Sequence, residues 1–139
     1  MSARKRGAKS SSAPRAKKSS APASAGAEPT EAERDVLAKI VAMSAPDRAL
    51  AERLHEIVRA HAPGLAPRLW YAMPAYAKDG KVILFFQSAD RFKTRYATLG
   101  FMHEARLDDG AMWPTAFALT KLGAAEEKKL IAMVKRAVR

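Results

Sequence analysis

The sequence predicts an α+β domain in which an antiparallel four-strand sheet is flanked by N-terminal and C-terminal helices. Apolar residues recur at helical spacing toward both ends of the chain. In the middle they alternate or run together, which is typical of strands. The pair Asp79-Gly80 favours a two-residue hairpin turn there. Strands grouped together between helices indicate the α+β class, and a chain of 139 residues is expected to hold one domain.

A basic tail precedes this domain. Residues 1–28 are rich in Ala, Lys, Ser and Pro, and we expect the domain to occupy residues 29–139. Residues 1–27 contain seven Lys or Arg and no Asp or Glu, so they carry +7 of the formal net charge of +11. Such a segment cannot bury enough apolar area to offset the entropy of ordering it, so it is predicted to be disordered. Nonspecific nucleic-acid binding through residues 4–18 and a solubility tail are both open.

Two helices are expected before the sheet and one after it. Thr30 followed by Glu33 has the spacing of a capping box. Ser44 followed by Pro46 marks a second helix start, so the first region is two helices or one helix broken at Ser44. Residues 124–138 form a clear amphipathic pattern, with acids first and cations last, which complements the helix dipole.

Four strands are expected between these helices. They cover residues 75–78, 81–87, 91–96 and 112–119, and a short turn of helix is expected over residues 65–70. The third strand alternates strictly, which would place three cations on one face of the sheet. A proline within the fourth strand argues for an edge position, because proline lacks a donor N–H.

No catalytic constellation is visible, so we expect a non-enzymatic domain. The chain has no nucleophile elbow, no phosphate-binding glycine loop and no dinucleotide fingerprint. It has no Cys, which excludes disulfides, thiolate metal sites and cysteine nucleophiles. No apolar run approaches the roughly 18 residues of a membrane span, and no hydrophobic segment follows the basic N-terminus. We therefore expect no membrane partner and a cytoplasmic location.

One segment of the chain contains candidate metal ligands. Its imidazole and carboxylates could supply nitrogen and oxygen ligands to a hard or borderline ion. A solvated loop with turn-forming acids is the alternative, and the absence of a metal-ligand spacing favours it. The candidate metal ligands are His103, Glu104, Asp108 and Asp109.

Aromatic and basic side chains interleave from Trp70 to Phe101, and this is the stronger functional signal. Such a surface could stack bases and neutralise phosphates, or line a pocket for a small anionic ligand. The alternative is that the aromatic residues pack a core while the cations protect an edge strand. The candidate surface residues are Trp70, Tyr71, Met73, Tyr76, Lys81, Arg91, Lys93, Arg95 and Tyr96.

Two subsets of these residues support different ligands. Nucleic acid would be bound by the tail together with the stripe of Arg91, Lys93 and Arg95. A small ligand would bind in a pocket near Trp70, Met73 and Tyr96. A homo-oligomer also stays open.

The run Tyr71-Ala72-Met73-Pro74-Ala75-Tyr76, followed by Gly80-Lys81-Val82 and Phe85-Phe86, resembles the domain of unknown function 1801, or YdhG-like, family. That family's pattern is an aromatic, one residue, Met-Pro, a small residue, an aromatic, and a glycine-turned hairpin into a Phe-rich strand. Residues 95–101, 107–110 and 112–115 look like its actinobacterial-type members. The resemblance covers about residues 34–138. The Gly that the family frequently has before Met-Pro is Ala72 in this chain.

The resemblance implies a frataxin-like fold, a sheet backed by N-terminal and C-terminal helices, and an intracellular iron chaperone. Iron is therefore the one cofactor that it suggests. The acids of the first helix would bind the iron, with His103 and Glu104 as a second candidate. The family has no catalytic or ligand motif that matches residues of this chain, so the resemblance assigns no site. The chain also departs from the acidic ridge of frataxin-type iron binding, since its domain is mildly basic.

Overall fold

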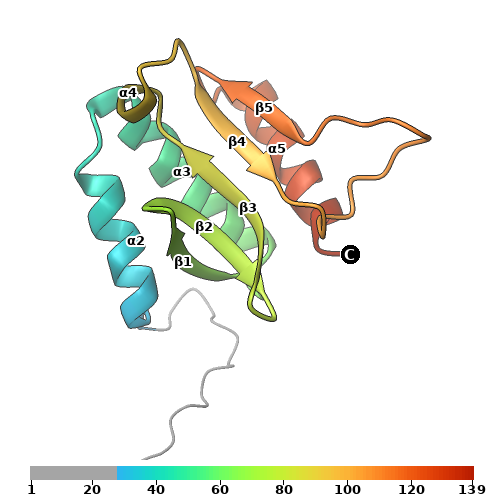
Figure 1. Cartoon of the computed structure of the whole chain (residues 1–139), viewed down its shortest axis with the longest axis horizontal. Coiled ribbons are helices and arrows are strands. Elements are labelled where there is room, and N and C mark those ends of the chain that lie inside the picture. Colours follow the sequence, from blue (N-terminus) through green and yellow to red (C-terminus); the bar gives the residue numbers. More distant parts are fainter. Residues whose placement is uncertain (1–27) are drawn as a thin grey trace, which may run out of the picture.

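Five antiparallel strands in sequential order form the centre of the molecule, with helices before and after them (Figure 1). The computed structural model describes residues 28–139, so the tail predicted to be disordered lies outside the described residues. The elements are α2 (Glu31–Val41), α3 (Ala45–His61), β1 (Ala66–Trp70), β2 (Met73–Lys78), β3 (Lys81–Gln87), α4 (Ala89–Phe92), β4 (Ala97–Phe101), β5 (Ala116–Leu119) and α5 (Ala124–Ala137). The α+β class is confirmed.

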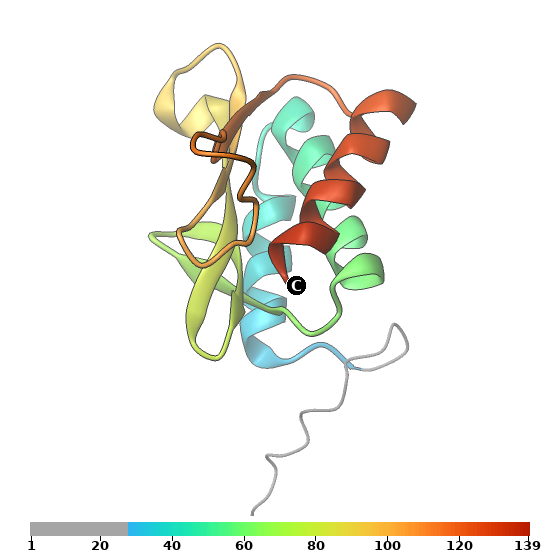
Figure 2. The same ribbon diagram turned by 90° about the vertical axis from the view of Figure 1, so that its right-hand side faces the viewer.

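The three long helices α2, α3 and α5 lie on one side of the sheet (Figure 2). The core forms between these two layers, because the apolar stripe of each helix faces the sheet. Tyr76 and Phe86 from the sheet are fully buried there, as are Leu54 of α3 and Val134 of α5. An antiparallel sheet covered in this way leaves its second face free of helices.

The helix starts follow the local sequence. The hydroxyl of Thr30 accepts a hydrogen bond from the backbone N–H of Glu33 at 3.0 Å, which caps α2. Pro46 lies in the first turn of α3, where its missing N–H costs nothing. At α5 the backbone N–H of Gly123 donates to the Glu126 carboxylate at 2.8 Å. All three helices expected from the sequence are therefore present.

The turn at Asp79 and Gly80 is confirmed. Both residues have positive φ, 52° and 79°, as a two-residue turn between paired strands requires. The pairing of β2 with β3 shifts once, because Tyr76 pairs with Leu84 while Ala77 pairs with Val82. Ile83 is the extra residue of this bulge, and it joins the core cluster rather than the opposite face.

The prediction of four strands is wrong. Residues 66–70, expected to be helical, form β1, which pairs with β2. Residues 91–96 do not form the third strand; α4 occupies part of that segment and β4 begins at Ala97. The reason lies far away in the sequence, since the Asp47 carboxylate accepts hydrogen bonds from the N–H groups of Ala89 (3.1 Å) and Asp90 (3.0 Å) and caps α4.

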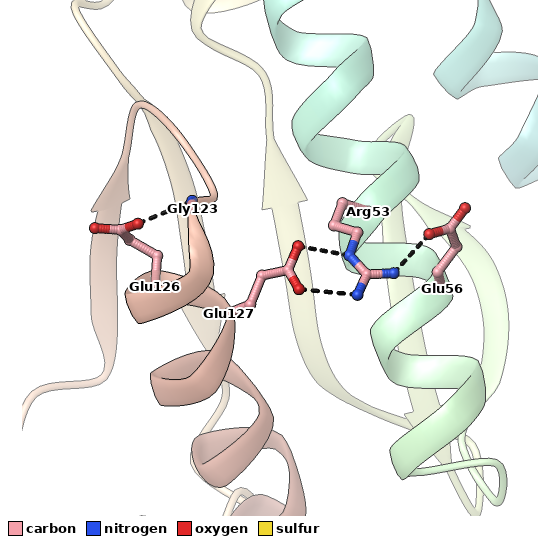
Figure 3. A network of polar contacts seen from close by, with 5 residues as sticks. All are labelled: Arg53, Glu56, Gly123, Glu126 and Glu127. Atoms are coloured by element: carbon pink, nitrogen blue, oxygen red, sulfur yellow. Dashed lines mark hydrogen bonds and ion pairs between the residues drawn. The ribbon is translucent and has the colours of Figure 1, made fainter.

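A bidentate ion pair connects α3 to α5 (Figure 3). Arg53 donates from Nε and Nη2 to the two carboxylate oxygens of Glu127, at 2.6 and 2.8 Å, and from Nη1 to Glu56 at 2.7 Å. The hydrogen bonds to Glu127 and then Glu56 raise the pKa of Arg53, and those from Arg53 lower the pKa of Glu127.

No helix within residues 28–139 is long and apolar enough to cross a membrane.

Candidate functional site

The face of the sheet turned away from the helices carries a contiguous set of aromatic rings. Tyr76 points toward the helices, so its neighbour Ala75 and the cross-strand partners Arg68 and Phe85 point the other way. Phe85 pairs with Gly100 of β4. The residues that pairing places on this open face include Arg68, Trp70, Met73, Ala75, Phe85, Gln87, Thr98, Gly100, Ala116 and Ala118.

Three rings on or beside this face touch one another and form what we call the aromatic row, Trp70, Tyr71 and Phe85. The ring centroids of Trp70 and Phe85 are 5.3 Å apart, and those of Trp70 and Tyr71 are 4.8 Å apart in an edge-to-face arrangement. The row is accessible, since Tyr71 is 76% exposed. A methyl group at Gly100 would overlap the far end of the Phe85 ring, so this glycine leaves room for the ring beside β4.

The turn between β1 and β2 fixes one end of the row. Tyr71 and Ala72 both have positive φ, 51° and 62°, although neither is glycine. Left-handed backbone costs an L-residue about 1–2 kcal/mol. Arg91 donates from Nη1 to the carbonyl oxygen of Tyr71 at 2.9 Å, which holds the turn against α4. Strain of this kind is often found at functional sites.

The charges of the two layers differ. The five strands contain three cations, Arg68, Lys78 and Lys81, and no Asp or Glu. All acids of the described helices and strands therefore lie in helices, such as Glu52 and Glu56 on α3. Of these three cations, the pairing places Arg68 on the open face, because Lys78 lies two residues from the inward-pointing Tyr76 and pairs with Lys81. No strand residue of the open face is a carboxylate that would repel an anion. Stacking on a base and contact with a phosphate are what this arrangement can do chemically.

The cationic stripe predicted for Arg91, Lys93 and Arg95 does not form, because these residues are not in a strand. Arg91 lies in α4, and Lys93 ends that helix in the left-handed region at φ 56°. The guanidinium of Arg91 lies 4.9 Å from the Phe92 ring, and that of Arg95 lies 5.4 Å from the Tyr96 ring. All three cations are exposed, and Arg91 is the one that reaches the aromatic row.

Tyr76 is not a surface residue, contrary to the sequence-based expectation. It is fully buried, and its hydroxyl lies 2.8 Å from Nδ1 of His55. Nε2 of His55 lies 2.7 Å from the Glu33 carboxylate, which also pairs with Arg59 at 3.2 Å. Burial, and secondarily the nearby charge of Glu33, raise the pKa of Tyr76. This carboxylate–imidazole–hydroxyl chain lies in the core and out of reach of a substrate.

Of the four candidate metal ligands, the structure brings two together. Nε2 of His103 lies 3.0 Å from the Glu104 carboxylate, and the His103 side chain is 84% exposed. Asp108 and Asp109 are exposed in the following loop. Across residues 28–139, no three or more His, Cys, Asp or Glu side chains gather as a metal site would require.

Met73 is buried and lines a cavity, whereas neither Trp70 nor Tyr96 lines it. The small-ligand pocket expected near these three residues is therefore not formed by them together. Sequence reasoning also missed Arg68, because residues 65–70 were assigned to a helix. The alternation of β3, which separates Phe85 from Phe86, was the available signal for the open face.

No family model, curated protein or solved structure matches this chain. The YdhG-like resemblance therefore stays a prediction.

Proposed function

We propose that the domain of residues 28–139 is a non-enzymatic binding domain that holds single-stranded nucleic acid on its open face. The observation that carries this proposal is the aromatic row of Trp70, Tyr71 and Phe85 beside Arg68 and Arg91. Stacking of a base on an aromatic side chain contributes about 1–3 kcal/mol and tolerates any base. The neighbouring cations would neutralise phosphates between stacked bases.

The basic tail would increase the affinity for nucleic acid without determining which surface of the domain binds it. Its seven cations can contact phosphates beyond the open face, and each such contact steepens the dependence on salt by about 0.7 in the log–log slope for a single strand. Stacking on the aromatic row contributes little to this slope, because no counterion is released by a ring. The two contributions can therefore be separated by a salt series.

The experiment compares the full chain with a chain that starts at Glu28, using an oligothymidylate at several salt concentrations. We expect both chains to bind, the full chain more tightly and with the steeper slope. Binding by the full chain alone would mean that the tail is responsible and would refute the role of the open face.

A matched pair of charge variants locates the surface. Arg68→Gln removes a cation from the open face, and Arg48→Gln removes one from α3 on the other side of the sheet, where it pairs with Glu52. We expect Arg68→Gln to weaken binding and to lower the slope by about 0.7. Arg48→Gln is expected to leave the binding affinity and the salt slope unchanged.

A second proposal follows from the resemblance: a YdhG-like, frataxin-like domain that acts as an intracellular iron chaperone. The resemblance itself is supported by the positive φ of 62° at Ala72, since the family frequently has Gly at this position and Gly adopts that conformation readily. Titration with ferrous iron under anaerobic conditions tests it, and no saturable binding below the high micromolar range would reject it. The cytoplasmic location stays a prediction.

A further inference from the structure

A cavity of about 210 Å³ lies at one end of the sheet, where the α2–α3 junction meets the β1–β2 turn and α4. At about 30 Å³ for each water, it has room for roughly seven water molecules or a small organic molecule. Its apolar wall consists of Met43, Met73, Pro74 and Phe86, and the last three are buried. This cavity is separate from the aromatic row, whose three rings do not line it.

A buried hydroxyl without a partner lines this cavity. Ser88 is 8% exposed and precedes α4, yet its side chain does not cap that helix, because Asp47 does so instead. Within residues 28–139, no hydrogen bond to or from the Ser88 hydroxyl is formed. Buried hydroxyls nearly always have a partner. A polar atom of a bound molecule would satisfy this one.

The charges around the cavity favour an anion. The Asp47 carboxylate is already engaged by three donors, namely the N–H groups of Ala89 and Asp90 and the hydroxyl of Ser44. At the exposed rim lie Lys39 and Arg91, neither of which forms an ion pair within the described part of the chain. Asp90 is the remaining acid of the rim. The rim is therefore net positive, and only one Arg91 nitrogen is used, by Tyr71.

We propose that this cavity binds a small organic anion, a carboxylate or a phosphate monoester with a short apolar body. The anionic oxygens would contact Arg91 and Lys39 and accept a hydrogen bond from the Ser88 hydroxyl. The apolar body would lie against Met43, Met73 and Phe86. This site is distinct from the aromatic row, although Arg91 lies beside both.

Four probes of similar shape test the proposal on the full chain by backbone amide spectra: butyrate, butyl phosphate, butyramide and butylamine. We expect one or both anions to shift the amides of Ala72, Ser88 and Arg91 saturably. The uncharged amide and the cationic amine are expected to cause no saturable shift. The two anions distinguish a carboxylate ligand from a phosphate ligand.

Variants then test the residues. Ser88→Ala and Arg91→Gln are each expected to weaken binding of the active anion by about fivefold or more. Arg95→Gln removes an exposed cation of the same segment that does not line the cavity, and it is expected to have no effect. Unchanged amide positions in α5 would show that each variant is folded.

Equal shifts with butyramide, or unchanged anion binding by Ser88→Ala, would overturn the proposal, as would no saturable shift with any probe. Ser88→Ala is also expected to bind oligothymidylate like the unsubstituted chain. Failure at the cavity is therefore distinguishable from failure at the open face.

Discussion

The hydroxyl of Tyr76 lies 2.8 Å from Nδ1 of His55, and this hydrogen bond joins the centre of the sheet to α3 inside the core. The other ring nitrogen faces the Glu33 carboxylate of α2 at 2.7 Å. Both ring nitrogens of His55 therefore have a hydrogen-bond partner inside the core. One strand and two helices, β2, α3 and α2, are thus linked by one buried polar network.

Removing the Tyr76 hydroxyl should be costly. Tyr76→Phe leaves Nδ1 of His55 buried without a hydrogen-bond partner, and an unsatisfied buried group costs about 1–3 kcal/mol. We expect that loss in the free energy of unfolding, measured by urea titration. Tyr96→Phe is the control, because the Tyr96 side chain is only half-buried. An equal effect of both substitutions would contradict the network's contribution.

The left-handed turn offers a substitution that should stabilise the protein. Ala72 has φ 62°, so Ala72→Gly relieves strain of about 1–2 kcal/mol. Glycine also makes the unfolded chain more flexible, and this lowers the free energy of unfolding by about 0.5–1 kcal/mol. We expect a net gain of up to about 1.5 kcal/mol in the free energy of unfolding.

The matched control for Ala72→Gly is a glycine substitution in a helix, which is expected to lower the free energy of unfolding. Ala49 is exposed within α3, and Ala49→Gly should destabilise the protein by about 1 kcal/mol. If Ala72→Gly destabilised the protein as well, the left-handed conformation of residue 72 would be refuted.

The pair of Arg53 and Glu127 predicts a dependence of stability on pH. Because Arg53 lowers the pKa of Glu127, the unfolded chain binds this proton more readily than the folded one, so stability rises with pH across that window. The contribution is complete above the ordinary Glu pKa, about 4.3, and is lost as the pH falls through the lowered pKa.

Glu127→Gln should therefore lower stability at neutral pH, and the difference from the unsubstituted chain should shrink on acidification. The effect should be small and weaken with salt, since both side chains are partly exposed. Chemical unfolding at several pH values checks it. Glu52→Gln, which breaks only an exposed pair within α3, is the control. A difference that grew toward acid pH would be inconsistent with the lowered pKa.

Gly100 should matter for the aromatic row. Gly100→Ala places a methyl group against the Phe85 ring, which must move away from β4. We expect a loss of about 1 kcal/mol in the free energy of unfolding and a change in Trp70 fluorescence, because Trp70 contacts that ring. Gly64→Ala meets no neighbouring atom and should be close to neutral. Unchanged fluorescence on Gly100→Ala would contradict the contact.

Local chemistry explains what could be predicted from the sequence. The Asp79-Gly80 turn and the cap at Thr30 depend on residues a few positions apart, so the local sequence was sufficient to predict both. The α4 helix was missed because its cap, Asp47, is more than forty residues away. The alternation of residues 91–96, correct as a pattern, was overridden by this contact.

The candidate site was predicted only in part, for a related reason. Tyr71 and Trp70 were named, but Tyr71 and Ala72 carry no turn signal, since neither favours positive φ. The strand that contains Arg68 was therefore not recognised. Tyr76 was assigned to the surface, because its partner His55 could be found only in the folded chain.

The central claim is that the aromatic row binds single-stranded nucleic acid, and Tyr71→Gly tests it most directly. This substitution removes an exposed ring and relieves a positive φ of 51°, which offsets the lost contact with Trp70, so the variant should remain folded. The measurement is the dissociation constant for oligothymidylate at fixed salt, on the chain that starts at Glu28. We predict a loss of affinity of about 1–3 kcal/mol, roughly fivefold to 150-fold. Unchanged affinity in the folded variant would contradict the claim.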